Sequence, residues 1–160
     1  MPARSHDKTN AERFLDREQV PYETVTYDPN IHSATDAAAA YGAPPDEVYK
    51  TLVLLREPAG RPLLVMVAGP REVDLKRLAR SLGEKRVRMA SQREAERLTG
   101  LLVGGIGALA LLGKPFDVCL DRAALAHARI YVNPGRRGVN VHLSVDDLVR
   151  LTRARVVDAT

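Results

Sequence analysis

Two closely spaced apolar runs near the middle of the chain restrict its fold more than any other feature. Residues 49–55 and residues 63–67 each have the length and composition of a buried strand. Between them lie residues 58–61, Pro-Ala-Gly-Arg, a composition typical of a turn. The pattern predicts a hairpin with a longer loop.

Helix-capping residues place helices around this hairpin. The first helix is predicted from Asn10, as its N-cap, to near Gln19, because Pro21 cannot continue it. Further helices are predicted from Ser33 to Gly42, from Asp74 to Gly83, from Ser91 to about Leu98, and after Ser144. Strands are predicted at residues 22–27, 87–89, 116–120, 130–132, 139–143 and 155–157. Helices and strands interleave without regular βαβ spacing, which predicts a mixed-sheet α/β or α+β domain.

The composition is typical of one soluble globular domain. The chain has 160 residues, of which 45% are apolar and 28% charged, enough to bury one core without disulfides. Its single cysteine, Cys119, excludes an intramolecular disulfide and a cysteine-rich metal site. Residues 1–10 are polar, and the longest apolar run, residues 101–112, is broken by glycines. We therefore expect no secretory signal, no membrane partner and a cytoplasmic location.

Net charge indicates a polyanionic partner only weakly. The formal charge is +4, but 24 basic residues are offset by 20 acidic residues spread along the chain. Surfaces that bind nucleic acid gather basic residues on one face. The candidate clusters are Lys76, Arg77 and Arg80; Lys85, Arg86 and Arg88; and Arg136 and Arg137. A solvated surface is the alternative for each cluster.

Lys50 places a charged side chain inside the first apolar run. An ammonium group in such a strand must reach a solvated face or meet an anionic partner, because burying it unpaired is costly. Lys50 is therefore either a lysine that extends to solvent at a sheet edge or a functional cation.

Two loops are candidates for ligand binding. Gly104, Gly105 and Gly107 lie within four residues, and backbone amides there can approach a ligand because no Cβ intervenes. The loop has neither a Walker ending nor the dinucleotide fingerprint, and a generic glycine turn is its alternative. Residues 133–138, Asn-Pro-Gly-Arg-Arg-Gly, form a turn whose arginines either bind phosphate or are solvated.

The other reactive side chains form no pattern typical of a metal site or an enzyme nucleophile. His6, His32, His127 and His142 do not have metal-binding spacing. Cys119 has no identifiable base nearby, which favours a buried, inert thiol. We expect no metal and no cofactor.

Four segments, taken in order, resemble the YbaK/EbsC family. They are Val48-Tyr49-Lys50-Thr51-Leu52, Asp74-Leu75-Lys76, Thr99-Gly100-Leu101-Leu102-Val103-Gly104-Gly105-Ile106, and Tyr131-Val132 with Gly135-Arg136-Arg137-Gly138. The family comprises free-standing deacylases related to the editing domain of bacterial prolyl-tRNA synthetase. The resemblance covers about residues 10–158. It implies a single domain, with a mixed, mostly antiparallel sheet, surrounding helices and a short flexible N-terminus at residues 1–9.

The resemblance implies hydrolysis of the ester that joins a wrong amino acid to tRNA, as in Cys-tRNA(Pro) or Ala-tRNA(Pro). Lys50 takes the catalytic position. Substrate-binding positions fall to Tyr27, Thr51, Gly104, Gly105, Ile106, Asn133 and Asn140. The implied partners are mischarged tRNA and prolyl-tRNA synthetase, with the chain a monomer or weak homodimer. We predict that Lys50, Gly104 and Gly105 meet in one pocket.

Two departures from the family pattern concern specificity. The family's glycine loop commonly continues as Ile-Ser-Pro-x-Gly, whereas here Ile106 is followed by residues 107–110, Gly-Ala-Leu-Ala. Asn140 stands where cysteine-specific members usually have an aspartate. We expect residues 105–108 to exclude proline by pressing close to the ligand.

The sequence leaves open both the identity of the nucleophile and whether the protein is catalytic at all. The nucleophile is water, the ribose hydroxyl or a substrate thiol, so the enzyme is a hydrolase, or a lyase if the thiol cyclises. A non-catalytic module that binds the acceptor end of tRNA, or another aminoacyl ligand, is the alternative function.

Overall fold

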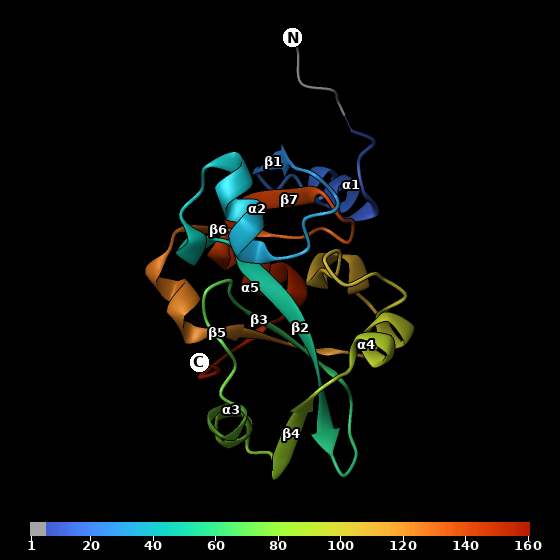
Figure 1. Cartoon of the computed structure of the whole chain (residues 1–160), viewed down its shortest axis with the longest axis vertical. Coiled ribbons are helices and arrows are strands. Elements are labelled where there is room, and N and C mark those ends of the chain that lie inside the picture. Colours follow the sequence, from blue (N-terminus) through green and yellow to red (C-terminus); the bar gives the residue numbers. More distant parts are fainter. Residues whose placement is uncertain (1–5) are drawn as a thin grey trace.

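The predicted hairpin is confirmed in the computed structural model, which describes residues 6–160 (Figure 1). Strand β2 (Tyr49–Glu57) pairs antiparallel with β3 (Leu63–Ala68). Every residue of β3 is buried. Since successive side chains point to opposite faces of a strand, Leu64 and Met66 enter one apolar core and Leu63 and Val65 enter another.

The strands form two sheets. A five-stranded mixed sheet has the order β4 (Arg86–Met89), β2, β3, β5 (Asp117–Asp121) and β8 (Arg155–Val157), in which β5 pairs parallel with both β3 and β8. A three-stranded antiparallel sheet has the order β1 (Tyr22–Thr26), β7 (Val139–Ser144) and β6 (Arg129–Val132). The predicted mixed, mostly antiparallel arrangement is confirmed, but it is divided into two sheets. Among residues 6–160, an isolated bridge from Val48 to Tyr131 is the only strand pairing between them.

Five α-helices surround the sheets within residues 6–160. They are α1 (Asn10–Arg17), α2 (Ala34–Tyr41), α3 (Leu75–Leu82), α4 (Gln92–Thr99) and α5 (Val145–Thr152). Short 3-10 turns occupy Pro45–Glu47, Ala108–Leu111 and Arg122–Ala126. The predicted N-caps Ser33, Asp74, Ser91 and Ser144 are confirmed, each accepting a backbone N–H through its side chain. None of the helices within residues 6–160 is long and apolar enough to span a membrane.

The start of the first helix differs from the prediction. Thr9, not Asn10, is the N-cap, and its side chain forms a reciprocal capping box with Glu12. The capping box outweighs the capping tendency of Asn10, because it satisfies two free backbone donors at once. Of the predicted flexible N-terminus, residues 1–5 lie outside the described part, and Thr9 is buried.

The two cores give the molecule its layers. Leu78 and Leu82 of α3 pack on one face of the five-stranded sheet, whereas the larger core includes Leu15 of α1, Leu148 of α5 and residues of both sheets. The three-stranded sheet lies with α1 and α2, and α3 and α4 flank the end of the other sheet where β4 lies (Figure 1).

Candidate active site

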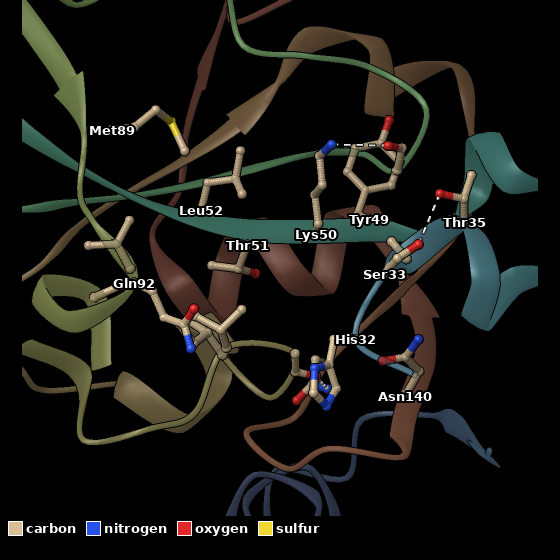
Figure 2. A pocket seen from close by; sticks show the side chains of 18 of the residues that line it. His32, Ser33, Thr35, Tyr49, Lys50, Thr51, Leu52, Met89, Gln92 and Asn140 are labelled. Carbon is tan, nitrogen blue, oxygen red and sulfur yellow. Dashed lines mark hydrogen bonds between the residues drawn. The ribbon is translucent and has the colours of Figure 1, made fainter. Parts of the chain in front are cut away.

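A cavity of about 520 Å³ lies against the first half of β2. Five consecutive residues of the strand, 49–53, line it. Figure 2 shows Lys50 and Leu52 on one side of the β2 ribbon and Thr51 on the other. The cavity therefore reaches both faces of the strand and passes along its edge.

The edge of β2 is open here because its neighbours stop on either side. β4 pairs with Leu54–Glu57 only, and the N–H of Ala90 donates to the carbonyl of Val53 at 3.0 Å. At the other end, the bridge to Tyr131 is at Val48. No strand within residues 6–160 pairs with the edge between these two points.

Lys50 extends along the cavity wall toward the end of β3. Its Nζ donates to the carbonyl oxygen of Gly69 at 3.0 Å. Burial lowers the pKa of this half-buried amine, and Glu72 acts in the opposite direction. A Cβ at Gly69 would lie 3.0 Å from the Cβ of Ala34, so glycine allows the first turn of α2 to lie close to Lys50.

The start of α2 forms a second wall of the cavity. His32, Ser33, Ala34 and Thr35 line it. The Ser33 hydroxyl accepts the N–H of Asp36 at 3.1 Å and lies 3.2 Å from the Thr35 hydroxyl. The amino end of a helix carries a partial positive charge. Lys50 and α2 therefore give this part of the cavity a positive potential.

In the glycine loop, Gly104 faces the cavity, whereas Gly105 and Gly107 face the loop at residues 133–137. A Cβ at Gly104, where φ is +90°, would lie 3.0 Å from the Cβ of His32. A Cβ at Gly105 would lie 2.8 Å from the backbone nitrogen of Arg137, and one at Gly107 would lie 1.9 Å from the carbonyl oxygen of Asn133. Gly105 and Gly107 thus admit neighbouring backbone rather than a ligand.

Asn133 joins these two loops. Its Nδ2 donates to the carbonyl oxygens of Gly104, at 3.1 Å, and Arg136, at 2.9 Å. Its Oδ1 accepts the N–H groups of Gly135 and Arg136. Arg137 adds a bond from its Nε to the carbonyl of Val103 at 2.8 Å. The cavity wall is therefore a pair of loops fixed to each other.

Tyr27 lines the cavity and belongs to a group of three tyrosine side chains. The Tyr41 ring centroid lies 5.8 Å from that of Tyr27 and 5.2 Å from that of Tyr131. Asn140 is buried, and its Nδ2 donates to the Tyr41 hydroxyl at 2.9 Å. Burial raises the pKa of Tyr27, and it raises that of Tyr41 to about 12. Both phenols are therefore neutral hydrogen-bonding groups at neutral pH.

The structure brings together most of the residues predicted from sequence. Tyr27, Lys50, Thr51, Gly104, Ile106, Asn133 and Asn140 all line the cavity. Gly105 does not line it, because it packs against the loop at Arg137. The prediction that Lys50, Gly104 and Gly105 meet in one pocket is therefore correct for the first two residues only.

Sequence reasoning missed the lining residues His32, Thr35, Met89 and Gln92. His32 and Thr35 lie close to Ser33, which the sequence identified as a helix N-cap. The cap predicted where the helix begins, but it gave no sign that this helix start lies beside Lys50. No sequence pattern pointed to Met89 or Gln92, which reach the cavity because α4 follows β4 directly.

Cys119 is not part of this site. It is 1% exposed, and burial raises the pKa of its thiol to about 11. Within residues 6–160, no three His, Cys, Asp or Glu side chains are grouped so as to hold a metal ion. The cavity's own polar groups are an amine, hydroxyls, amides and one imidazole.

The basic residues differ in whether they have a partner within the protein. The guanidinium of Arg136 donates to the carbonyl of Asp7, and Arg88 pairs with Glu94 at 2.8 Å and with Glu57 at 3.2 Å. Arg93 and Arg97, one turn apart on α4, are exposed and form no ion pair with any described residue. Two exposed cations without an ion-pair partner among the described residues therefore lie on α4, which also supplies Gln92 and Ala95 to the lining.

Comparison with known proteins gives a consistent result. Residues 28–151 match the model of the aminoacyl-tRNA editing domain. An Enterococcus faecalis protein named "Putative Cys-tRNA(Pro)/Cys-tRNA(Cys) deacylase EbsC" is 30% identical over 159 residues, covering 98% of this chain and 96% of that protein. The proline–tRNA ligase of Aquifex aeolicus is 30% identical over 90 residues, which are 56% of this chain and 15% of the ligase. A crystal structure described as "a putative trans-editing enzyme for prolyl tRNA synthetase" superposes with a TM-score of 0.79 at 25% identity, covering 97% of this chain and 99% of the other.

Proposed function

The chain belongs to the aminoacyl-tRNA editing domain family, and we propose that it removes a wrong amino acid from tRNA by hydrolysing the ester bond. The substrates we propose are Cys-tRNA(Pro) and Ala-tRNA(Pro). The observation that carries the proposal is the juxtaposition of the Lys50 amine, the start of α2 and Gly104 around one cavity. The named deacylase that aligns over nearly the whole chain supports the same reaction.

The cavity has the size and polarity that such a substrate requires. A volume of about 520 Å³ lies within the usual range for small-molecule sites. Lys50, Ser33 and Asn140 line one side of the cavity, and Leu52, Met89 and Gln92 lie toward the other (Figure 2). An aminoacyl ester with its terminal adenosine combines polar and apolar parts in the same way.

The chemistry needs no nucleophile from the protein. An aminoacyl ester is already activated, so orientation and stabilisation of the developing oxyanion are the main requirements. In the proposed reaction, the Lys50 ammonium and the amides at the start of α2 stabilise that oxyanion. Water attacks the ester carbon, with the neighbouring ribose hydroxyl able to act as a proton relay, or the thiol of a cysteinyl substrate attacks it and forms a cyclic thioester. In either case the bond from the acyl carbon to the ribose oxygen breaks, and that oxygen leaves with the proton lost by the nucleophile.

We propose that the apolar part of the cavity lining determines which amino acid the protein removes. The expectation that residues 105–108 exclude proline changes, because Gly105 and Gly107 contact the loop of Asn133 and Arg137. Of residues 105–108, Ile106 lines the cavity, together with Val103 and Ala95. We propose that these side chains limit the acyl group to small residues and exclude the proline ring, since steric exclusion is easier to build than rejection of a smaller group.

The partners follow from the proposed reaction. Mischarged tRNA is the substrate, and prolyl-tRNA synthetase is the enzyme whose errors would be corrected. The alternative function is a module that binds the acceptor end without turnover. We propose a cytoplasmic location, as translation substrates require.

Single-turnover deacylation tests the proposal. Excess protein is mixed with Cys-, Ala- or Pro-tRNA(Pro), and loss of the acyl group is followed in parallel with Lys50→Ala. We expect the cysteinyl or alanyl ester to be cleaved far faster than the prolyl ester, and Lys50→Ala to be slow. Protection of all three esters would favour the binding module, whereas equal cleavage of all three would exclude an editing role.

A further inference from the structure

The open edge of β2 is a main-chain binding surface inside the cavity. A residue of a strand points its N–H and C=O to the same side, and the next residue points them to the other side. The carbonyl of Val48 accepts from Gly69, beyond the end of β3, at 2.8 Å. The carbonyl of Val53 accepts from Ala90, beyond β4, at 3.0 Å.

These two bonds fix the direction of the backbone groups between them. Even-numbered residues of this segment direct their N–H and C=O toward β3, and odd-numbered residues direct theirs toward the open edge. Thr51 is the odd residue at the middle of the segment, and it is opposite Met66 on β3. Its N–H and C=O therefore face the cavity side, where no described strand pairs with them.

An α-aminoacyl ester carries the groups that pair with such an edge. In every second opposed pair of an antiparallel sheet, the two residues exchange both N–H···O=C bonds. The α-amine of an aminoacyl group is a donor and its ester carbonyl is an acceptor, placed one carbon apart as in a peptide residue. Addition of a strand-like group to an open sheet edge is a recurrent mode of recognition.

We propose that the aminoacyl group binds as one residue of an antiparallel strand on Thr51. Its α-amine donates to the Thr51 carbonyl, and its ester carbonyl accepts the Thr51 N–H. The surface selects esters of amino acids by their main-chain groups, whatever the side chain, and holds the ester carbonyl at the edge of β2. This inference rests on the proposed function for the identity of the ligand.

The first test uses the unaltered protein and does not require turnover. Two stable amide analogues of the terminal adenosine are titrated, one with an alanyl group and one with a propionyl group, which lacks only the α-amine. Loss of a hydrogen bond from a charged donor weakens binding by roughly ten- to hundredfold, and we expect the propionyl analogue to bind that much more weakly. Equal affinities would overturn the inference.

The second test removes the backbone donor. Thr51→Pro deletes an N–H that makes no bond to β3, and proline is tolerated at the open edge of a strand. Thr51→Val keeps that N–H and removes the hydroxyl. We expect Thr51→Pro to deacylate Ala-tRNA(Pro) at least tenfold more slowly than Thr51→Val, with thermal unfolding of both variants as the control for folding. Equal loss in the two variants would assign the role to the side chain and overturn the inference.

The two tests separate this inference from the proposed function. If the protein binds the alanyl analogue better than the propionyl analogue but cleaves no ester, the edge surface stands and the enzymatic function fails. If it cleaves the esters and binds the two analogues equally, the enzymatic function stands and the edge surface fails.

Discussion

The two halves of β2 have the same strand conformation but different neighbours. From Leu54 to Glu57 the strand pairs with β4, and its charged residue Arg56 pairs with Glu84 at 2.7 Å and Asp117 at 2.9 Å. From residue 49 to 53 one edge is open, and its charged residue Lys50 makes its hydrogen bond to a backbone carbonyl in a cavity. The edge of β2 that β4 covers from Leu54 onward is therefore open beside residues 49–53, where the cavity lies, and the charge in this open half is available to a ligand.

The largest effect is expected when the two basic residues of β2, Lys50 and Arg56, are each replaced by alanine. Lys50→Ala should slow deacylation by roughly 10²–10³-fold, as removal of one oxyanion donor typically does, with little change in the free energy of unfolding. Arg56→Ala should lower that free energy by about 2 kcal/mol, since two acidic partners lose their cation, while the folded variant stays active. Single-turnover rates and urea unfolding measure both effects. An Arg56→Ala protein that is folded but as slow as Lys50→Ala would contradict the division of β2 into two halves.

The second prediction concerns the loop wall opposite the open half. Gly107→Ala should destabilise the protein by about 3 kcal/mol, the upper part of the range for overpacking, because a Cβ there would lie 1.9 Å from the Asn133 carbonyl oxygen. Gly113→Ala is the matched control, since φ is +79° but no atom lies within 4 Å of the added Cβ. It should cost about 1 kcal/mol. Urea unfolding compares the two, and equal losses would mean that the loops separate easily.

The third prediction concerns the surface beside the open half. If α4 guides the acceptor stem, affinity for tRNA falls as salt rises, and the double change Arg93→Ala and Arg97→Ala reduces the slope of log affinity against log salt by about 1–2. Arg13→Ala with Arg17→Ala on α1 has the same spacing on a helix that supplies no residue to the cavity. Filter binding at several salt concentrations measures the slopes. The same slope for both double variants would place the RNA elsewhere.

The smallest expected effect concerns pH. Burial lowers the pKa of Lys50 below its ordinary value of 10.5, so a reaction that needs the charged amine declines as pH rises through that lowered value. Lys50→Arg keeps its charge throughout this range and should lose the decline while remaining slower overall through altered geometry. Deacylation rates corrected for spontaneous hydrolysis, measured across alkaline pH, test this. A decline that is identical in both proteins would assign it to another group.

Local patterns predicted the fold well because each depends on neighbouring residues. The hairpin required only two apolar runs and a turn, and Ser91 with Glu94 located a helix start through two reciprocal bonds. The division of the strands into two sheets depends on which strands pair with β2. That choice is made by packing across the whole domain, so the sequence alone did not predict it.

The candidate site was predicted in part for a similar reason. Lys50 was conspicuous as a charge in an apolar run, and Asn133 came from the resemblance to a known family. Gly105 was misjudged because glycine permits close approach without showing what approaches, and here it is the backbone at Arg137. His32 and Gln92 reach the cavity from segments whose positions depend on tertiary structure.

The contact between Gly107 and Asn133 affects how this protein can be redesigned. A library that varies residues 104–107 would mainly yield proteins with displaced loops, because an added side chain at Gly105 or Gly107 meets main-chain atoms. Positions at the start of α2, such as His32 and Thr35, are exposed to the cavity or to solvent and accept new side chains without moving backbone. Directed evolution toward a new acyl group should therefore begin at α2 and leave the glycines unchanged.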